Sequence, residues 1–161
     1  MLLSKNLGPI GAAPQSPVLE LDYQGRGRTR QLVRLSDGRE AKLLLPRGRP
    51  LMDGDLLEGD NGERVLVRAK AEPVVIARAG SFKELVPAAY HLGNRHVPLE
   101  IGELFLKFLP DPVIEDLALR LGLKVERTEA PFNPVTGPYH GHSHGHSHGH
   151  GHGHLHGNGN G

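Results

Sequence analysis

The sequence predicts an α+β protein with a small β-rich domain, a second domain of mixed strands and helices, and a histidine-rich tail. Three zones of different composition support this division. Residues 1–72 alternate short apolar runs with Gly-containing turns, and residues 73–139 carry apolar repeats at helical spacing. Residues 140–161 are almost entirely Gly, His, Ser and Asn. A chain of 161 residues is long enough for one ordinary domain or two small ones.

Short strands separated by turns characterise the first domain. The Asp37-Gly38 pair lies between two apolar runs, which is a strong hairpin signal. Pro73 favours a domain boundary, because proline cannot donate to a strand ladder. Strands at such regular, short intervals predict an all-β domain. The expected strands are Val18–Tyr23, Gln31–Leu35, Ala41–Leu45, Leu56–Leu57 and Arg64–Ala69.

The best helical pattern begins the second domain. Ser81 offers an N-cap hydroxyl, and Glu84 three residues later completes the pattern of a capping box. Pro87 lies inside this helix and is expected to kink or interrupt it. Gly93 is a plausible end, since glycine commonly follows the last helical turn.

The remaining elements predict a strand-helix-strand-strand-helix-strand order. Asp111 can cap the second helix, with Pro112 at its first position, and Gly122 closes it. This order is that of a ferredoxin-like (βαββαβ) domain. The expected strands around the two helices are Val74–Ala77, Val97–Ile101, Glu103–Phe108 and Leu123–Arg127.

The tail carries the clearest chemical signal, because from residue 140 to residue 156 every second residue is histidine. Neutral imidazole is a good ligand for divalent Ni, Zn and Cu. In an extended chain, alternate residues place their rings on one side. A segment so poor in apolar residues is expected to be disordered without metal. The candidate ligands are His140, His142, His144, His146, His148, His150, His152, His154 and His156.

Two alternatives to a metal-binding role stay open for the tail. It resembles a purification tag, although tags are usually uninterrupted histidine runs and this one alternates. Its composition also fits a low-complexity, solvated segment with only incidental affinity for metals.

His91 and His96 are the only histidines outside the tail. On a continuous helix they would point about 140° apart, so they could not chelate one ion from one face. One histidine makes a weak metal site, but two copies across a dimer two-fold would supply two ligands, and tail histidines could complete the shell. Taken alone, each of them fits better as a surface or satisfied core histidine than as a metal ligand.

Residues Tyr90–Ile101, with Gly-Asn-Arg-His at their centre, resemble the signature of the urease accessory protein UreE family. The resemblance covers roughly residues 17–139. It implies a β-rich N-terminal domain and a ferredoxin-like metal-binding domain that forms a homodimer, with His96 as the metal ligand at the interface. Further similar stretches are Leu35–Glu40, Leu45–Gly48, Asp53–Asp55, Glu115–Asp116, Gly122–Glu126 and Ala130–Phe132.

The resemblance also implies a function, which is the delivery of Ni(II) to the urease apoprotein together with other urease accessory proteins, including the GTPase. Some family members carry a further His-x-His pair after the strand that follows the signature. Here that stretch is Pro110–Val113, so a second metal site on the folded body is not expected. A buffer or storage protein for Ni, Zn or Cu is the alternative, since composition alone does not separate storage from delivery.

Composition argues against other classes of protein. The net charge of +1 lacks the basic excess of nucleic-acid-binding domains, and we interpret Arg26, Arg28 and Arg30 as a solvated turn. There is no cysteine, no apolar run of membrane-spanning length and no recognisable signal peptide, so a soluble cytosolic protein is expected. An enzyme is not expected either, because His91 and His96 fall short of the roughly three fixed ligands of a catalytic zinc.

Overall fold

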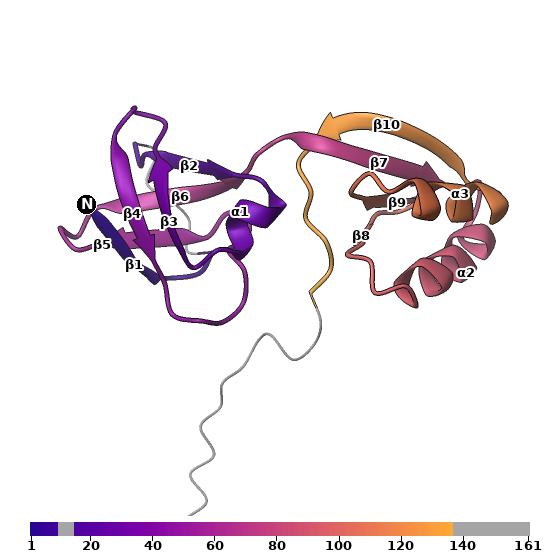
Figure 1. The fold of residues 1–161 in the computed structure, drawn as a ribbon, viewed down its shortest axis with the longest axis horizontal. Coiled ribbons are helices and arrows are strands. Elements are labelled where there is room, and N and C mark those ends of the chain that lie inside the picture. The colour runs from indigo at the N-terminus through magenta and orange to yellow at the C-terminus, as the bar shows by residue number, and fades with distance from the viewer. Residues whose placement is uncertain (10–14, 137–161) are drawn as a thin grey trace, which may run out of the picture.

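The computed structural model of the chain describes residues 1–9 and 15–136, so the predicted tail lies outside the described residues. Two sheets form two bodies that lie side by side along the long axis of the molecule (Figure 1). The elements of the first are β1 Leu2–Asn6, β2 Val18–Leu21, α1 Tyr23–Gly27, β3 Arg30–Arg34, β4 Glu40–Leu44, β5 Leu56–Gly59 and β6 Arg64–Ala69. Those of the second are β7 Glu72–Arg78, α2 Phe82–Gly93, β8 Glu100–Ile101, β9 Phe105–Phe108, α3 Pro112–Arg120 and β10 Lys124–Ala130.

The first sheet has six strands in the order β2-β6-β5-β1-β4-β3. Its edges meet at one end, where the Ser36 N–H donates to the Val18 carbonyl at 2.8 Å and the Val18 N–H to Ser36 Oγ at 2.9 Å. The sheet therefore curls towards a barrel. Its inward-facing side chains form one aliphatic cluster, which includes Leu3, Leu19 and Val67, all fully buried.

Two elements of this domain differ from the prediction. β1 was not expected, because its sequence, LLSKN, has only a short apolar run; it becomes a strand by pairing with β4 and β5, which are distant in sequence. The strand expected over Val18–Tyr23 ends at Leu21, since Asp22 caps the short helix α1 by accepting from the Gly25 N–H at 2.6 Å. The domain is thus rich in β structure but not all-β. Strand β6 matches its predicted range, Arg64–Ala69.

Asp55 organises the loop that precedes β5. It is fully buried and accepts two hydrogen bonds of 2.9 Å from the Arg49 guanidinium, one from the Met52 N–H and one from Asn6 Nδ2. Burial acts to raise the pKa of the Asp55 carboxyl, but these hydrogen bonds outweigh it and lower the pKa below its ordinary value. The charged carboxylate therefore holds the loop from Arg49 to Met52 in place.

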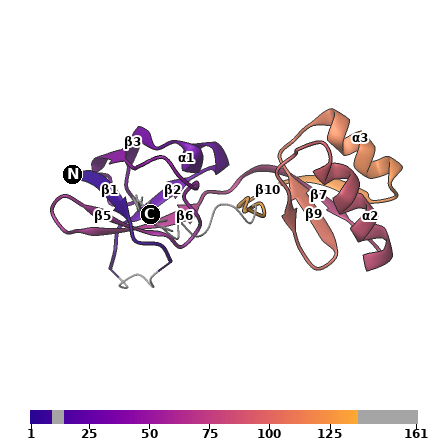
Figure 2. The ribbon, with the colours of Figure 1, turned by 90° about the horizontal axis from the view of Figure 1, so that it is seen from below.

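The second sheet has four antiparallel strands in the order β10-β7-β9-β8. Helices α2 and α3 lie on the same side of it (Figure 2). Their apolar faces, with Leu85 and Leu92 from α2 and Ile114 from α3, join Leu106 and Phe108 of β9 in a second buried cluster. As predicted, Asp111 caps α3 and Pro112 is its first residue; the Asp111 carboxylate accepts from the Val113 N–H at 2.9 Å.

The predicted start of α2 is wrong in its details. Ser81 is the N-cap residue, but its side chain makes no capping hydrogen bond, and the Glu84 carboxylate accepts from the Gly80 N–H at 2.8 Å instead. Pro87 neither ends nor divides the helix, which runs from Phe82 to Gly93. It falls in the second turn, and its side chain is on the exposed side.

All four strands of the second domain have other bounds than predicted. The candidates Val97–Ile101 and Glu103–Phe108 shorten to β8 and β9, whereas the first strand lengthens to Glu72–Arg78 as β7 and the last extends to Ala130 as β10. Pro73 lies within β7, opposite Glu129 of β10, where β9 does not yet pair. Its missing N–H therefore faces an unpaired edge and costs no ladder bond. Within the described residues, no helix combines the length and apolar character needed to cross a membrane.

Candidate functional site

Residues 131–136, which we call the interdomain strap, follow β10 and run between the two domains. Two hydrogen bonds tie the strap to the second domain. The Val135 N–H donates to the Leu99 carbonyl at 2.8 Å, and the Asn133 N–H donates to Glu100 Oε2 at 2.7 Å. The strap is therefore fixed to the residues that lead into β8.

A buried ion pair reinforces this attachment. Lys107 is only 8% exposed, and its ammonium donates to Glu100 Oε1 at 2.8 Å and to the Pro131 carbonyl at 3.0 Å. Both oxygens of the Glu100 carboxylate are thus engaged, one by a side chain of the sheet and one by the backbone of the strap. Removing one member of a buried pair leaves the other charge uncompensated, which is costly.

The first domain holds the strap from the other side. Arg26, which is 3% exposed, donates from Nη1 to Asn133 Oδ1 at 3.1 Å and from Nη2 to the Phe132 carbonyl. The Phe132 ring is fully buried and meets the Tyr23 ring edge to face, with 5.2 Å between centroids. Burial lowers the pKa of the Arg26 guanidinium, and the nearby carboxylate of Glu72 acts in the opposite direction. One backbone segment therefore bridges both domains.

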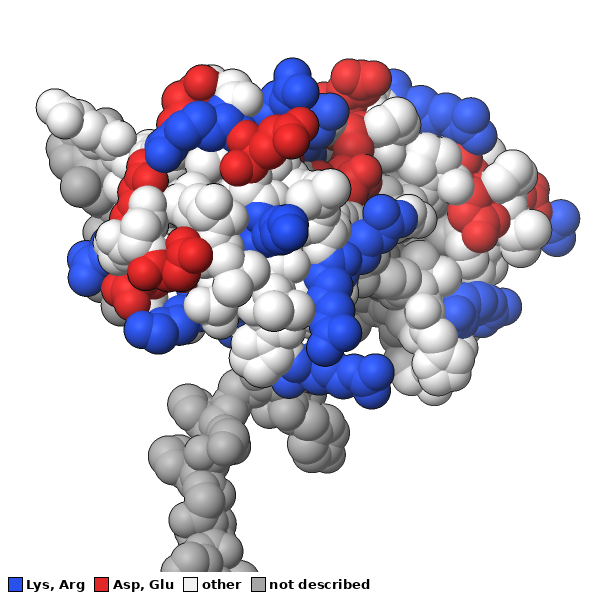
Figure 3. All heavy atoms as spheres, turned by 60° about the vertical axis from the view of Figure 1, so that its left-hand side comes forward, with Lys and Arg blue, Asp and Glu red and all other residues white. Residues whose placement is uncertain are grey.

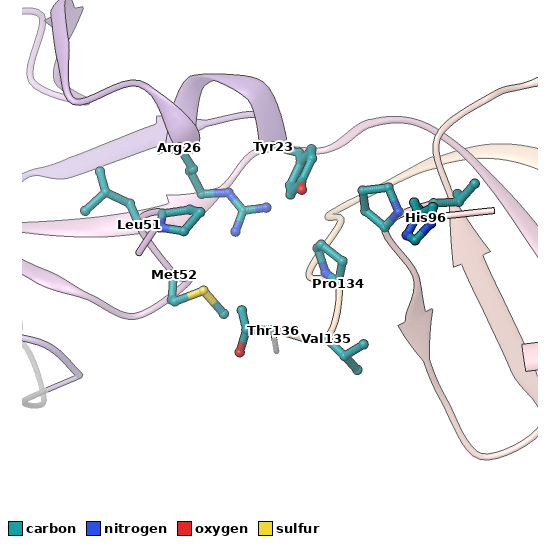
Figure 4. A pocket seen from close by; sticks show the side chains of 11 residues that line it. Tyr23, Arg26, Leu51, Met52, His96, Pro134, Val135 and Thr136 are labelled. Atoms are coloured by element: carbon teal, nitrogen blue, oxygen red, sulfur yellow. The ribbon is translucent and has the colours of Figure 1, made fainter. Parts of the chain in front are cut away.

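A pocket of about 560 Å³ lies between the domains beside the strap. Figure 4 shows Tyr23 and Arg26 on the side of the first domain and His96 on the side of the second, with Pro134 of the strap between them. The other lining residues are Pro50, Leu51, Met52, Val97, Pro98, Val135 and Thr136.

His96 occupies a tight turn just after α2. Its N–H donates to the Gly93 carbonyl and the Arg95 N–H to the Leu92 carbonyl, each at 3.0 Å. With φ of 57°, His96 is the one non-glycine residue with positive φ among residues 1–9 and 15–136. The left-handed conformation costs an L-residue roughly 1 kcal/mol, and such strain occurs often at functional sites. The turn leaves the imidazole exposed at the pocket.

His91 does not share this position. It lies exposed in the last turn of α2, where its ring meets the Tyr90 ring edge to face at 5.5 Å. In the part of the chain that the structure describes, no three His, Asp or Glu side chains gather as a group that could hold a metal ion. The nine tail histidines, from His140 to His156, lie outside the described residues. Of the two histidines that the structure describes, only His96 therefore lines the pocket.

Sequence reasoning missed Tyr23, Arg26 and the strap. Arg26 was expected in a solvated turn with Arg28 and Arg30, but it is buried, and only the other two are exposed. Its strap partner Asn133 is more than a hundred residues away in sequence, so no local pattern identifies the contact. The one available signal was the Asp22 cap, which turns the chain at the end of β2 and directs α1 towards the strap.

The fold and the pocket together define a two-domain α+β protein that presents an exposed imidazole between its domains. Two family models match the chain: the N-terminal domain of the UreE urease accessory protein over residues 3–70 and its C-terminal domain over residues 72–156. The chain belongs to the UreE urease accessory protein family.

Named relatives agree with this assignment. The chain is 46% identical over 127 residues to the urease accessory protein UreE of Burkholderia ambifaria, a match that covers 79% of this chain and 63% of that protein. Identity is 46% to the protein of Burkholderia orbicola and 45% to that of Burkholderia vietnamiensis, again over 79% of this chain, with 62% and 64% of those proteins covered. The chain therefore spans somewhat less than two thirds of the length of these relatives.

We predict that Phe132→Ala loosens the strap, because it removes the one buried ring that fills the space beside Tyr23. The substitution should lower the free energy of unfolding by roughly 3 kcal/mol. It should also speed hydrogen exchange at the Val135 amide. Urea denaturation and exchange measured by NMR check both effects. Val135→Ala is the matched control, since its exposed side chain can be shortened without loss of the backbone bond to Leu99. Equal effects of the two substitutions would contradict the prediction.

Proposed function

We propose that this protein is a nickel-binding metallochaperone that delivers Ni(II) for assembly of the urease active site. Membership of the UreE family supports a role in urease maturation. The observation that carries the nickel role is His96, an exposed imidazole held in a strained turn at the mouth of the interdomain pocket. Imidazole binds Ni(II) well, and an exposed ligand leaves the ion accessible to an acceptor. A cytosolic location stays a prediction of the sequence.

We further propose that the protein binds metal as a homodimer. Phe82, Val86 and Tyr90 follow one another at four-residue spacing along α2, which places them on one face of the helix. Their side chains are 59%, 64% and 67% exposed, so the single chain leaves this apolar stripe uncovered. A second copy packed there by two-fold symmetry would bring a second His96 to the same end of the helix.

The proposal extends to the fold and the partners. We assign the second domain to the ferredoxin-like class on its βαββαβ element order and its β10-β7-β9-β8 sheet. The urease apoprotein is the proposed acceptor of the ion, and the other urease accessory proteins, including the GTPase, are the proposed partners. The role is one of binding and delivery, and no catalytic step is assigned to any residue.

A buffer for divalent transition metals is the second candidate. Nine histidines at alternate positions favour it, because such a tract binds Zn(II) as well as Ni(II), and Cu(II) more tightly than either. Storage depends on the tail alone, whereas delivery depends on a site on the folded domains. The two functions are therefore separable by truncation.

His96→Ala should weaken nickel binding by at least roughly tenfold in a chain that ends at Tyr139, because it removes the imidazole that each copy contributes. His91→Ala in the same chain is the control and should change the affinity little. Calorimetric titration at neutral pH measures both. Binding to the unsubstituted chain should weaken as the pH is lowered, since a metal ion and a proton compete for the same imidazole nitrogen. An unchanged affinity of the His96→Ala protein would refute the assignment.

Val86→Glu should convert the dimer to a monomer, because it would bury two carboxylates in the centre of the α2 stripe. Val113→Glu on α3, at a valine that is also largely exposed, should leave the dimer intact. Sedimentation equilibrium distinguishes these states, and circular dichroism shows whether each variant is folded. A protein that is monomeric before substitution, or a Val86→Glu protein that still dimerises, would rule out this interface.

Truncation after Tyr139 should separate delivery from storage. A metallochaperone keeps His96 after the truncation and should still support urease activation in cells supplied with ample nickel. A buffer should lose both its metal capacity and its effect on the cells. Urease activity and metal content measured in the same cultures decide between them. Loss of urease activation despite ample nickel would favour the buffer.

A further inference from the structure

The arginines of the first domain are concentrated in two segments that lack acidic residues. Residues 23–36 contain four arginines, and residues 41–52 contain one lysine and two arginines, with no Asp or Glu in either range. The whole chain has a net charge of only +1, so positive charge is gathered here and balanced elsewhere. Figure 3 shows basic side chains collected in one run on a face of the molecule, with acidic side chains set apart from most of it.

The structure brings the two segments together around a groove. Two adjoining hollows, of about 510 Å³ and 200 Å³, are both lined by residues 27–29 and 45–47. We call this surface the arginine groove. Arg28, Arg30 and Arg47 line it and are exposed, and none of the three forms an ion pair with a described residue. Arg49, by contrast, is committed to Asp55.

The walls of the groove are fixed by the fold. The Leu45 N–H donates to the Thr29 carbonyl at 2.8 Å, and this hydrogen bond joins the two segments that line the groove. Gln31 Nε2 donates to the Gly25 carbonyl at 2.7 Å and holds α1 against β3. With the backbone of the groove held in this way, its exposed arginine side chains are the groups on this protein that binding would order, which limits its share of the entropic cost of association.

We propose that the arginine groove docks an acidic, extended segment of a partner polypeptide. Guanidinium groups pair with carboxylates through two parallel hydrogen bonds, so three unpaired arginines along a groove suit carboxylates at intervals along a chain. Leu45, Pro46 and Leu51 add apolar wall between the charges, which suits the intervening side chains of a peptide.

Two features favour a peptide over other anions. The described residues that line the two hollows include no aromatic ring, whereas single-stranded nucleic acid is usually bound by stacking on such rings. The arginines are spread along a groove that extends over both hollows, which exceeds what one small inorganic anion would contact.

The groove adjoins the candidate metal site. Arg26 and Leu51 line both the smaller hollow of the groove and the interdomain pocket that His96 faces. A docked segment would therefore lie against a wall shared with that pocket. Docking itself needs no metal, so its test is independent of the proposed nickel function.

The test uses the full chain treated with a chelator and a short fluorescein-labelled peptide in which glutamate alternates with valine. Fluorescence anisotropy at about pH 8, where histidine is neutral, should show saturable binding that weakens as salt is raised. The same peptide with glutamine in place of glutamate should not bind. Arg28→Gln/Arg30→Gln/Arg47→Gln should weaken binding roughly tenfold, as expected for three partly solvated ion pairs.

Arg64→Gln/Arg78→Gln/Arg120→Gln is the matched control, because it removes the same charge from exposed arginines on other elements. At a salt concentration that screens long-range charge interactions, this variant should bind the peptide with an affinity within about twofold of that of the unsubstituted protein. Circular dichroism checks that both triple variants are folded. Equal weakening by the two triple variants, no peptide binding, or binding of a single-stranded RNA in place of the peptide would each overturn the proposal.

Discussion

The geometry of the pocket depends on two hydrogen bonds that the carboxylate of Glu100 accepts. One of its oxygens accepts from the buried ammonium of Lys107, and the other accepts from the Asn133 N–H of the strap. A buried lysine needs a charged partner, and here that partner lies on β8, only four residues after His96. The same charge therefore stabilises the sheet and positions the strap. Because Arg26 and Tyr23 hold the strap from the first domain, the relative placement of the domains follows from this contact. Asp55 has a comparable role on the opposite wall, where its hydrogen bonds hold the loop that carries Met52.

The two sides of the proposed metal site impose different physical demands. His96 has to be held firmly enough to present its ring in one direction, and the turn closed by its bond to Gly93 does this at the cost of a left-handed backbone. The neighbouring α2 stripe has to remain uncovered until a second copy arrives, although exposed Phe82, Val86 and Tyr90 are unfavourable in water. On the proposed function, the strained backbone of His96 and the exposed apolar stripe both serve the association of two copies. The apolar stripe runs along α2 and the strained turn follows the last residue of the same helix, so association of two copies along the stripe would cover it and could bring the two imidazoles together.

Elements that depend on local sequence were the predictable part of the fold. The hairpin at Asp37-Gly38 and the Asp111 cap with Pro112 follow from turn and capping chemistry within a few residues, and the structure confirms them. Strand β1 was missed because its stability comes from β4 and β5, far along the chain. Local rules also failed where a different hydrogen bond formed. The Glu84 carboxylate accepts from the Gly80 N–H, whereas the capping box predicts that it accepts from the Ser81 N–H. The family signature identified His96 as a candidate, but the pocket around it arises from Arg26 and the strap, whose contacts cross the whole chain.

A carrier of metal ions has to release what it binds, and the ligand count bears on this requirement. On the proposed function, one imidazole from each of two copies would fill two coordination positions of a nickel ion and leave the others to the tail, to water or to an acceptor. A closed set of four protein ligands holds zinc as a structural element, whereas an open position allows exchange. Ligand exchange is easier when the acceptor is already bound nearby, since its ligands then act at a high effective concentration. The arginine groove shares Arg26 and Leu51 with the wall of the His96 pocket, which is where such tethering would have the largest effect on transfer. The two proposals are therefore complementary, because docking would supply the selectivity for the acceptor that two imidazoles alone would not have.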